Sequence, residues 1–206
     1  LRAIGYEAIE IMGEDGWTTS PAVIGSEERK EIGRIIQDVG FDLSAVMMRL
    51  PLCEEEDGYP EMLDQFRAVC GLARDLCFEA ESVVVSSPLG CSHLSWEGGR
   101  ERIAASLIDM AEIANEHGVI LAVEPHVGSV LDSPEKAVWL MEQTGHPALK
   151  LNFDISHFHV HAMNLRRCID LCLSHAAHIH IKDGYHDGDG KVVFQLPGEG
   201  SLDLHE

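Results

Sequence analysis

The 206-residue sequence predicts an α/β protein with the (β/α)₈-barrel pattern, from three features. Three apolar, strand-like runs occupy residues 121–126, 149–157 and 178–183, and each contains residues that can bind a metal. Helix-like segments separate these runs. The candidate ligands Glu124, Asp154 and His180 follow one another at intervals of 30 and 26 residues. One strand-plus-helix unit of such a barrel takes about 31 residues, so the spacing is that of successive barrel strands.

The same alternation extends toward the N-terminus. Residues 1–5 are expected to end a helix, Ser26 to cap the next one, and Gly40 to stop it. Apolar periodicity and turn residues predict strands at 6–12, 43–48, 82–87, 121–126, 149–154 and 178–183, and helices at 26–39, 60–73, 100–116, 134–144 and 164–176. We therefore expect one domain over residues 1–206 with about six βα units, which is an incomplete barrel without the first and last strands.

Side-chain parity places the candidate ligands on one face. Alternate residues of a strand point to opposite sides, so Asn152 and Asp154 lie opposite Leu151. By the same rule Glu124 lies opposite Val123. In the last run the face of His178, His180 and Lys182 is opposite Ile179 and Ile181, which are expected to pack under helices. Glu124, Asp154 and His180 should then converge near the C-terminal ends of the strands, where barrel active sites lie.

Two carboxylates and one imidazole form a hard-to-borderline ligand set. It suits a single divalent cation, namely Mn²⁺, Mg²⁺, Co²⁺ or catalytic Zn²⁺. His178 faces the same way but lies further from the strand end, so we expect it to be a packed interior histidine.

Four short motifs carry a resemblance to the xylose isomerase-like barrels, which include sugar isomerases and epimerases, inosose dehydratases, hydroxypyruvate isomerases and endonuclease IV. The motifs are Val-Glu124-Pro, Asp154-x-x-His157, His178-Ile-His180-Ile-Lys-Asp183 and Leu196-Pro-Gly-Glu-Gly200. The resemblance implies a metal bound by Glu124, Asp154 and His180, and a substrate hydroxyl held by His157. In related enzymes the eighth strand supplies a further glutamate ligand, which has no counterpart among these residues.

The leading functional expectation is a metal-dependent isomerase or epimerase that acts on a small sugar, cyclitol or hydroxy-ketone through an enediolate. Glu124 is the candidate acid/base group. Lys182 is expected either to hold a substrate oxygen or to form an interior salt bridge with Asp183 or Glu199. Two alternatives stay open: an inosose-type dehydratase, which shares the first step, and a non-catalytic barrel that binds a ligand.

Composition argues against nucleic acid as a partner. The chain has 15 basic and 35 acidic residues and a formal net charge of −20, whereas nucleic-acid binders rely on clustered Lys and Arg. A DNA repair endonuclease of this superfamily also needs additional metal-binding histidines, and residues 47–51, 86–90 and 194–198 contain no histidine. The expected partner is a small polyhydroxylated molecule.

The six cysteines include no Cys-x-x-Cys pair, and Cys168 and Cys172 are four apart in a helical stretch. Buried or helix-surface thiols are therefore expected for this pair rather than a zinc site, in a reducing compartment. The sequence shows no 18-residue apolar run and no signal peptide, which favours a cytoplasmic protein without membrane contact. Open strand edges would favour a homo-oligomer.

Overall fold

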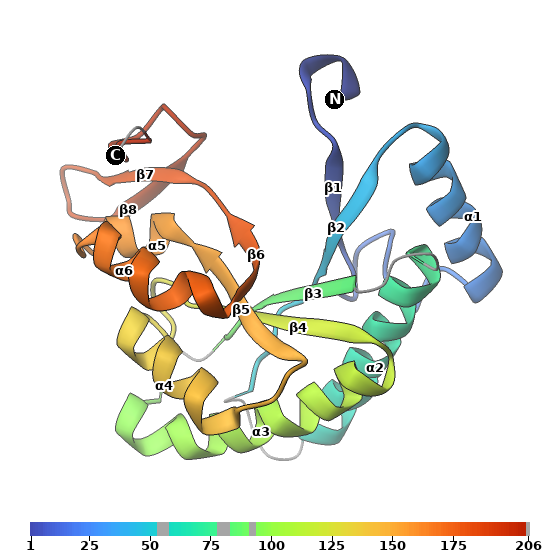
Figure 1. The fold of residues 1–206 in the computed structure, drawn as a ribbon, viewed down its shortest axis with the longest axis horizontal. Coiled ribbons are helices and arrows are strands. Elements are labelled where there is room, and N and C mark those ends of the chain that lie inside the picture. Colours follow the sequence, from blue (N-terminus) through green and yellow to red (C-terminus); the bar gives the residue numbers. More distant parts are fainter. Residues whose placement is uncertain (53–57, 78–82, 91–93, 205–206) are drawn as a thin grey trace.

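The computed structural model describes residues 1–52, 58–77, 83–90 and 94–204, and its centre is a curved, six-stranded parallel sheet (Figure 1). The strands follow one another in chain order: β1 Ala8–Met12, β2 Asp42–Met47, β3 Val83–Pro88, β4 Val119–Glu124, β5 Leu149–Asp154 and β6 Ala176–His180. Sequential parallel strands joined by helices form a half-barrel, which confirms the predicted incomplete (β/α)₈ architecture.

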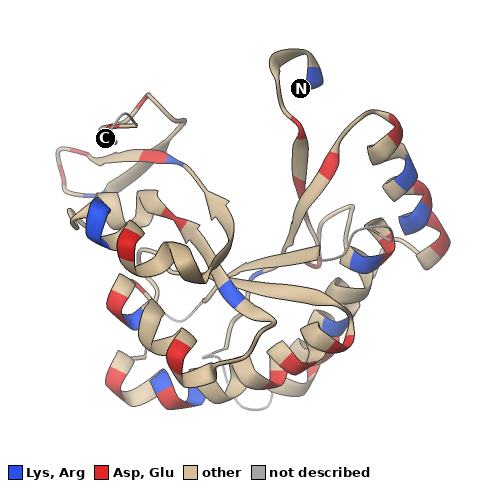
Figure 2. Ribbon diagram, viewed as in Figure 1, with Lys and Arg blue, Asp and Glu red and all other residues tan. Residues whose placement is uncertain are grey.

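Helices cover the outer face of this sheet. They are α1 Ser26–Asp38, α2 Tyr59–Leu76, α3 Trp96–Glu116, α4 Pro134–Thr144, α5 Ile155–Val160 and α6 Leu165–Cys172, with 3₁₀ turns η1 Arg2–Ile4 and η3 Leu173–His175. Figure 2 shows most charged residues on these helices and few on the strands.

The hydrophobic core lies between the sheet and the helices. Its strand side is formed by alternate residues such as Val85, Leu121 and Leu151, and its helix side includes Phe66 and Leu107, all of them buried. The other set of alternate residues faces the barrel interior. Parity therefore separates an apolar side, which holds the fold together, from a polar side that is available for chemistry.

Most of the predicted helix signals are present. Ser133 caps α4 by accepting the Lys136 N–H, and Gly145 ends that helix with a positive φ of 56°. The prediction for Ser26 was wrong: Gly25 occupies the cap, and the Ser26 hydroxyl donates to Asp75 instead. Helix α3 begins at Trp96, earlier than predicted, because the preceding Ser95 caps it by accepting the Gly98 N–H.

The last predicted strand differs most from the structure. Strand β6 ends at His180, and Ile179 and Ile181 are 51% and 55% exposed rather than packed under helices. The chain after β6 forms an antiparallel hairpin of β7 Asp183–His186 and β8 Val192–Gln195, so these residues provide no covering helix. Residues 187–190 form the bend of the hairpin, whose strands were not predicted.

Cys168 and Cys172 are buried, free thiols, as expected. Residues Cys53, Cys91 and Ser82, the last of which begins a predicted strand, lie outside the described residues. Within the described part of the chain, no helix combines the length and the apolar character needed to cross a membrane.

Candidate metal and active site

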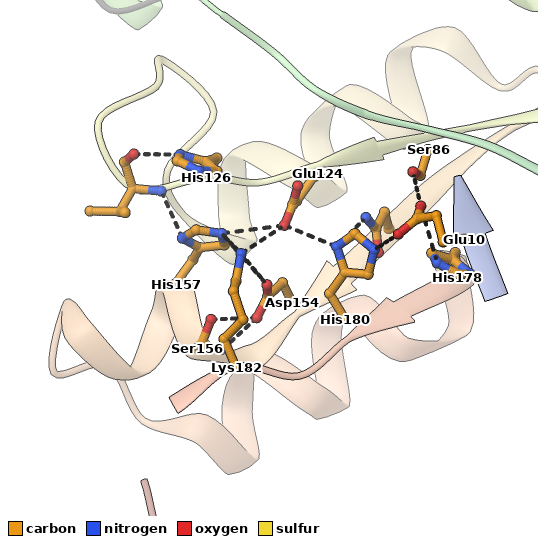
Figure 3. A network of polar contacts seen from close by, with 12 residues as sticks. Glu10, Ser86, Glu124, His126, Asp154, Ser156, His157, His178, His180 and Lys182 are labelled. Carbon is orange, nitrogen blue, oxygen red and sulfur yellow. Dashed lines mark hydrogen bonds and ion pairs between the residues drawn. The ribbon is translucent and has the colours of Figure 1, made fainter. Parts of the chain in front are cut away.

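Glu124 and Asp154 are the last residues of β4 and β5, and their side chains lie on the inner face of the half-barrel (Figure 3). They are 1% and 0% exposed. Burying two carboxylates is costly unless each finds a cation or several hydrogen bonds. The groups that surround the two carboxylates therefore indicate which ligands the site can bind.

One imidazole and one ammonium meet these carboxylates. His157 Nε2 lies 3.3 Å from Glu124 Oε1 and 3.6 Å from Asp154 Oδ2. Lys182 Nζ lies 2.8 Å from Asp154 Oδ2, 3.7 Å from Glu124 Oε1 and 3.1 Å from His157 Nε2. We call these four residues the Glu124 cluster. Its formal charge with neutral histidine is −1, because two carboxylates face one ammonium.

Local structure fixes the orientation of each carboxylate and of His157. Asp154 caps α5 by accepting the Ser156 N–H at Oδ1, which leaves Oδ2 directed into the cluster. His157, in the first turn of α5, accepts the Val127 N–H at Nδ1 over 3.3 Å. Its ring also packs on that of His126, with the ring centroids 4.0 Å apart. The short helix α5, which the sequence did not predict, thus brings His157 to the strand ends.

The β7–β8 hairpin lies against the same cluster. The Phe194 ring is 5.1 Å from Lys182 Nζ and 5.2 Å from the His157 ring, measured to its centroid. Asp183, beside Lys182, accepts four backbone N–H groups, from Gly184, Gly198, Gly200 and Leu202. These hydrogen bonds lower the pKa of Asp183 to about 2 and fasten the 198–202 segment to β7.

A second group of polar residues adjoins the first through His180. The His180 ring places Nδ1 3.5 Å from Glu124 Oε1 and Nε2 2.8 Å from Glu10 Oε2. Glu10 comes from the middle of β1, and its other oxygen accepts the Ser86 hydroxyl and lies 3.7 Å from His178 Nε2. We call Glu10, Ser86, His178 and His180 the Glu10 cluster.

Glu124 and His180 join the two clusters, and in both residues hydrogen bonds and nearby charges together outweigh the effect of burial on the pKa. Burial alone would raise the pKa of Glu124, but hydrogen bonds with His157 and His180 and the Lys182 charge lower it below its ordinary range. Burial opposes a charged imidazole, yet hydrogen bonds to Glu10 and Glu124 raise the pKa of His180 to about 10. Glu124 is therefore ionised at neutral pH, with a cationic His180 beside it when no metal is bound.

The donor set fits a divalent cation. Ligand atoms of Glu124, Asp154 and His157 all lie within 4.8 Å of one another, and so do those of Glu10, His178 and His180. Among the described residues Asp154 Oδ2 receives no hydrogen bond of good geometry, although the Lys182 ammonium is near it. A buried carboxylate oxygen with a spare lone pair and a net negative charge is what a hard cation requires.

The structure thus connects the predicted ligands Glu124, Asp154 and His180 through polar contacts but places them in two adjoining clusters. Glu124 and Asp154 lie with His157 and Lys182, whereas His180 contacts Glu124 from the Glu10 side. The predicted alternative salt bridge of Lys182 with Asp183 or Glu199 was wrong, because its ammonium pairs with Asp154 and Glu124. The sequence reasoning missed Glu10, although a lone charge between Ile9 and Ile11 in a strand was a usable signal.

Comparison with curated proteins gives distant enzyme relatives. The chain is 24% identical over 116 residues to an inosose dehydratase of Mesomycoplasma hyopneumoniae, a match that covers 50% of this chain and 39% of that protein. It is 22% identical over 226 residues to an inosose dehydratase of Bacillus licheniformis, which covers 98% of this chain and 71% of that one. The chain thus spans well under two thirds of the first of these relatives.

Solved structures share the fold. The IolI protein, crystallised with a bound zinc atom, superposes with a TM-score of 0.81 at 19% identity, over 98% of this chain and 73% of that one. A Mycobacterium smegmatis barrel in complex with magnesium gives 0.72 at 18% identity, covering 98% and 71%. An L-ribulose 3-epimerase gives 0.73 at 21%, covering 92% and 65%.

The family model described as "Xylose isomerase-like TIM barrel" matches residues 1–206. Together with the six sequential parallel strands and the neighbouring folds, this match leads to one conclusion. The chain belongs to the xylose isomerase-like TIM barrel family.

Proposed function

We propose that this chain is part of a divalent-metal-dependent enzyme that isomerises or epimerises a small polyhydroxylated ketone, such as a sugar, cyclitol or hydroxy-ketone. The first step would remove a proton from the carbon beside the carbonyl and give an enediolate. The observation that carries the proposal is the Glu124 cluster, in which two buried carboxylates, an imidazole and an ammonium converge at the C-terminal ends of barrel strands.

The proposed metal ligands are Glu124, Asp154 and His180, as the family resemblance implies. When bound, a divalent cation would act as a Lewis acid and stabilise the negative charge that develops on the substrate oxygens. The zinc bound to the IolI protein and the magnesium bound to the Mycobacterium smegmatis barrel support a divalent ion without fixing its identity.

The protein's own residues would supply proton transfer and orientation. Glu124 is ionised and can therefore accept the proton. Its low pKa makes it a weak base, which favours the later return of the proton to the substrate. Lys182, 37% exposed at its side chain, can turn its ammonium toward a substrate oxygen, and His157 Nε2 can bind a hydroxyl.

Dehydration is the second candidate, and the sequence relatives favour it. Both curated relatives described above are inosose dehydratases. The same proton abstraction followed by loss of a β-hydroxide would give a dehydratase. The hairpin residue Phe194 covers Lys182 and His157 and would help to exclude water from either reaction.

One experiment separates these reactions. The protein is incubated in D₂O with Mn²⁺ and a panel of ketoses and inososes, and products are followed by NMR and mass spectrometry. Deuterium uptake without loss of water supports isomerisation or epimerisation, and uptake with loss of one water supports dehydration. Absence of exchange by a metal-loaded protein across the whole panel would contradict both and favour a ligand-binding barrel.

We further propose that the protein acts on a small molecule, in the cytoplasm, without nucleic-acid or membrane partners, and that it can form a homo-oligomer. The net charge of −20 supports the first point, because it opposes contact with phosphate backbones. A fluorescence-anisotropy titration with abasic-site DNA at physiological salt should show negligible binding, and tight binding would overturn this part of the proposal.

A further inference from the structure

Both ring nitrogens of His180 face carboxylates that come from distant parts of the chain. Nε2 lies 2.8 Å from Glu10 Oε2, on β1, and Nδ1 lies 3.5 Å from Glu124 Oε1, at the end of β4 (Figure 3). The Glu10 side chain is itself held, because the Ser86 hydroxyl donates to its Oε1. Glu10 is thus a fixed acceptor on one side of the His180 ring.

A fixed carboxylate selects the proton position of an imidazole. Nε2 must carry a hydrogen to donate to Glu10, so Nδ1 is the nitrogen that can give up its proton and offer a lone pair to a metal. That atom lies 3.5 Å from Glu124 Oε1 and 3.0 Å from Nδ2 of Asn152, whose amide can donate to its lone pair. Histidines that bind metals commonly donate their other N–H to a carboxylate, which fixes the tautomer and the ring orientation.

We propose that Glu10 is a positioning residue for His180: it holds the Nε2 proton and so aims Nδ1 at the Glu124 side of the metal site. This inference rests on the metal site of the proposed function. It assigns a role to Glu10, which is remote in sequence from every proposed ligand and contacts none of the carboxylates in the Glu124 cluster.

A rival interpretation is that Glu10, His178 and His180 bind a metal themselves, since their ligand atoms also lie within 4.8 Å of one another. The hydrogen bonding favours positioning. Both Glu10 oxygens already have hydrogen-bond partners, His180 and Ser86. Asp154 Oδ2 in the Glu124 cluster has the Lys182 ammonium at 2.8 Å but no hydrogen bond of good geometry among the described residues. Because the Lys182 side chain is 37% exposed, its ammonium can move aside for a metal, so Asp154 Oδ2 is the better place for a cation.

The test uses Glu10→Gln with Glu7→Gln as its matched control. Glu7 lies three residues earlier, is exposed and undergoes the same chemical change. Zn²⁺ and Mn²⁺ affinities and stoichiometries are measured by calorimetry against a competing chelator. We expect Glu10→Gln to weaken binding about 10–100-fold, the range found for outer partners of metal-binding histidines. Glu7→Gln should leave the affinity unchanged.

A second variant and a second readout guard against misfolding of Glu10→Gln. Ser86→Ala removes only the hydroxyl that supports Glu10, and it should weaken metal binding in the same direction by a smaller factor. In ¹⁵N-labelled protein, the wild type should show a solvent-protected Nε2–H signal for His180 with and without Zn²⁺. Glu10→Gln should lose that protection, and Glu7→Gln should keep it.

Unchanged affinity in Glu10→Gln, a stoichiometry of two metals in the wild type, or a proton on Nδ1 in the zinc-loaded protein would each overturn the inference. These results are independent of turnover. A wild type that binds one metal through His180 but exchanges no substrate proton would refute the proposed function and leave the role of Glu10 standing. If the wild type bound no metal, the Nε2–H signal and its dependence on Glu10 would still decide the matter.

Discussion

The two polar clusters inside the half-barrel have similar residue types but a different electrostatic balance. The Glu124 cluster places two fully buried carboxylates against one ammonium. The Glu10 cluster is only partly buried, and its single carboxylate faces two imidazoles and a hydroxyl. His180 contacts both. Similar side chains thus form one cluster, around Glu124, with more negative than positive charge, and another in which both oxygens of Glu10 have partners.

This difference in charge balance indicates different roles for the two clusters. An unbalanced, buried carboxylate pair is stabilised by any cation that reaches it, so the Glu124 cluster has the character of a binding and reaction site. A satisfied carboxylate that is hydrogen-bonded at both oxygens has little to gain from a ligand, and it restrains its neighbours instead.

The largest effect is expected from Glu124→Gln. The amide keeps the shape but removes a proposed metal ligand and the proton acceptor, so deuterium exchange into the substrate should fall by about 10²–10⁴-fold. Exchange is measured by NMR in D₂O with Mn²⁺ present. The matched control is Glu142→Gln, on the exposed face of α4, which should exchange at the wild-type rate. Equal rates for both variants would mean that the acid/base group lies elsewhere.

Lys182→Met should show that the buried carboxylates require a cation. Loss of the ammonium removes the positive partner of Asp154 and leaves Glu124 with His180 alone. Metal-free stability should therefore fall by about 1–3 kcal/mol, less than for a fully buried pair. Added Mn²⁺ should then raise the melting temperature more in the variant than in the wild type. The control Lys30→Met breaks an exposed pair with Glu27 and should gain nothing from the metal.

Asp183→Asn tests the anchor beside Lys182. The folded pKa of about 2 lies below the value of about 3.9 in an unfolded chain. The stability that Asp183 contributes is therefore present above pH 4 and is lost as the pH falls from about 4 to 2. The variant should exchange the Gly198, Gly200 and Leu202 amides faster than the wild type at pH 7, as measured by hydrogen exchange. The difference should disappear near pH 2, and a difference that persists there would contradict a charge-based anchor.

The smallest effect is expected from His178→Gln. His178 Nε2 is 3.7 Å from Glu10, and a partly exposed pair of this kind contributes about 1 kcal/mol at most. Metal affinity measured by calorimetry should therefore change by no more than about fivefold. A loss as large as that of Glu10→Gln would make His178 a ligand and would erase the distinction between the clusters.

The sequence was sufficient for most features that depend on local periodicity, except the end of β6. Strand spacing and parity predicted the parallel half-barrel and put Glu124, Asp154 and His180 on its inner face. These properties depend on residues near one another in the chain, which is why they can be predicted from it.

The features that the sequence did not predict depend on contacts between residues far apart in the chain and on irregular segments. Glu10 reaches His180 only because β1 and β6 curve toward one another, and no local pattern encodes that contact. The hairpin was missed because its two strands have four residues each, too few for a clear alternation. The role of Lys182 was left open because its partners are set by an irregular segment, the turn between β6 and that hairpin.

The most direct test of the account is to locate the metal itself. Crystals grown with Mn²⁺ or Zn²⁺ are measured at the absorption edge of the metal, and an anomalous difference map is calculated. We expect one peak bounded by Glu124, Asp154 and Nδ1 of His180, with the Lys182 ammonium moved away from Asp154 and Glu10 still on Nε2. A peak bounded by Glu10, His178 and His180, or a metal-loaded protein whose peak lies away from Glu124 and Asp154, would contradict it.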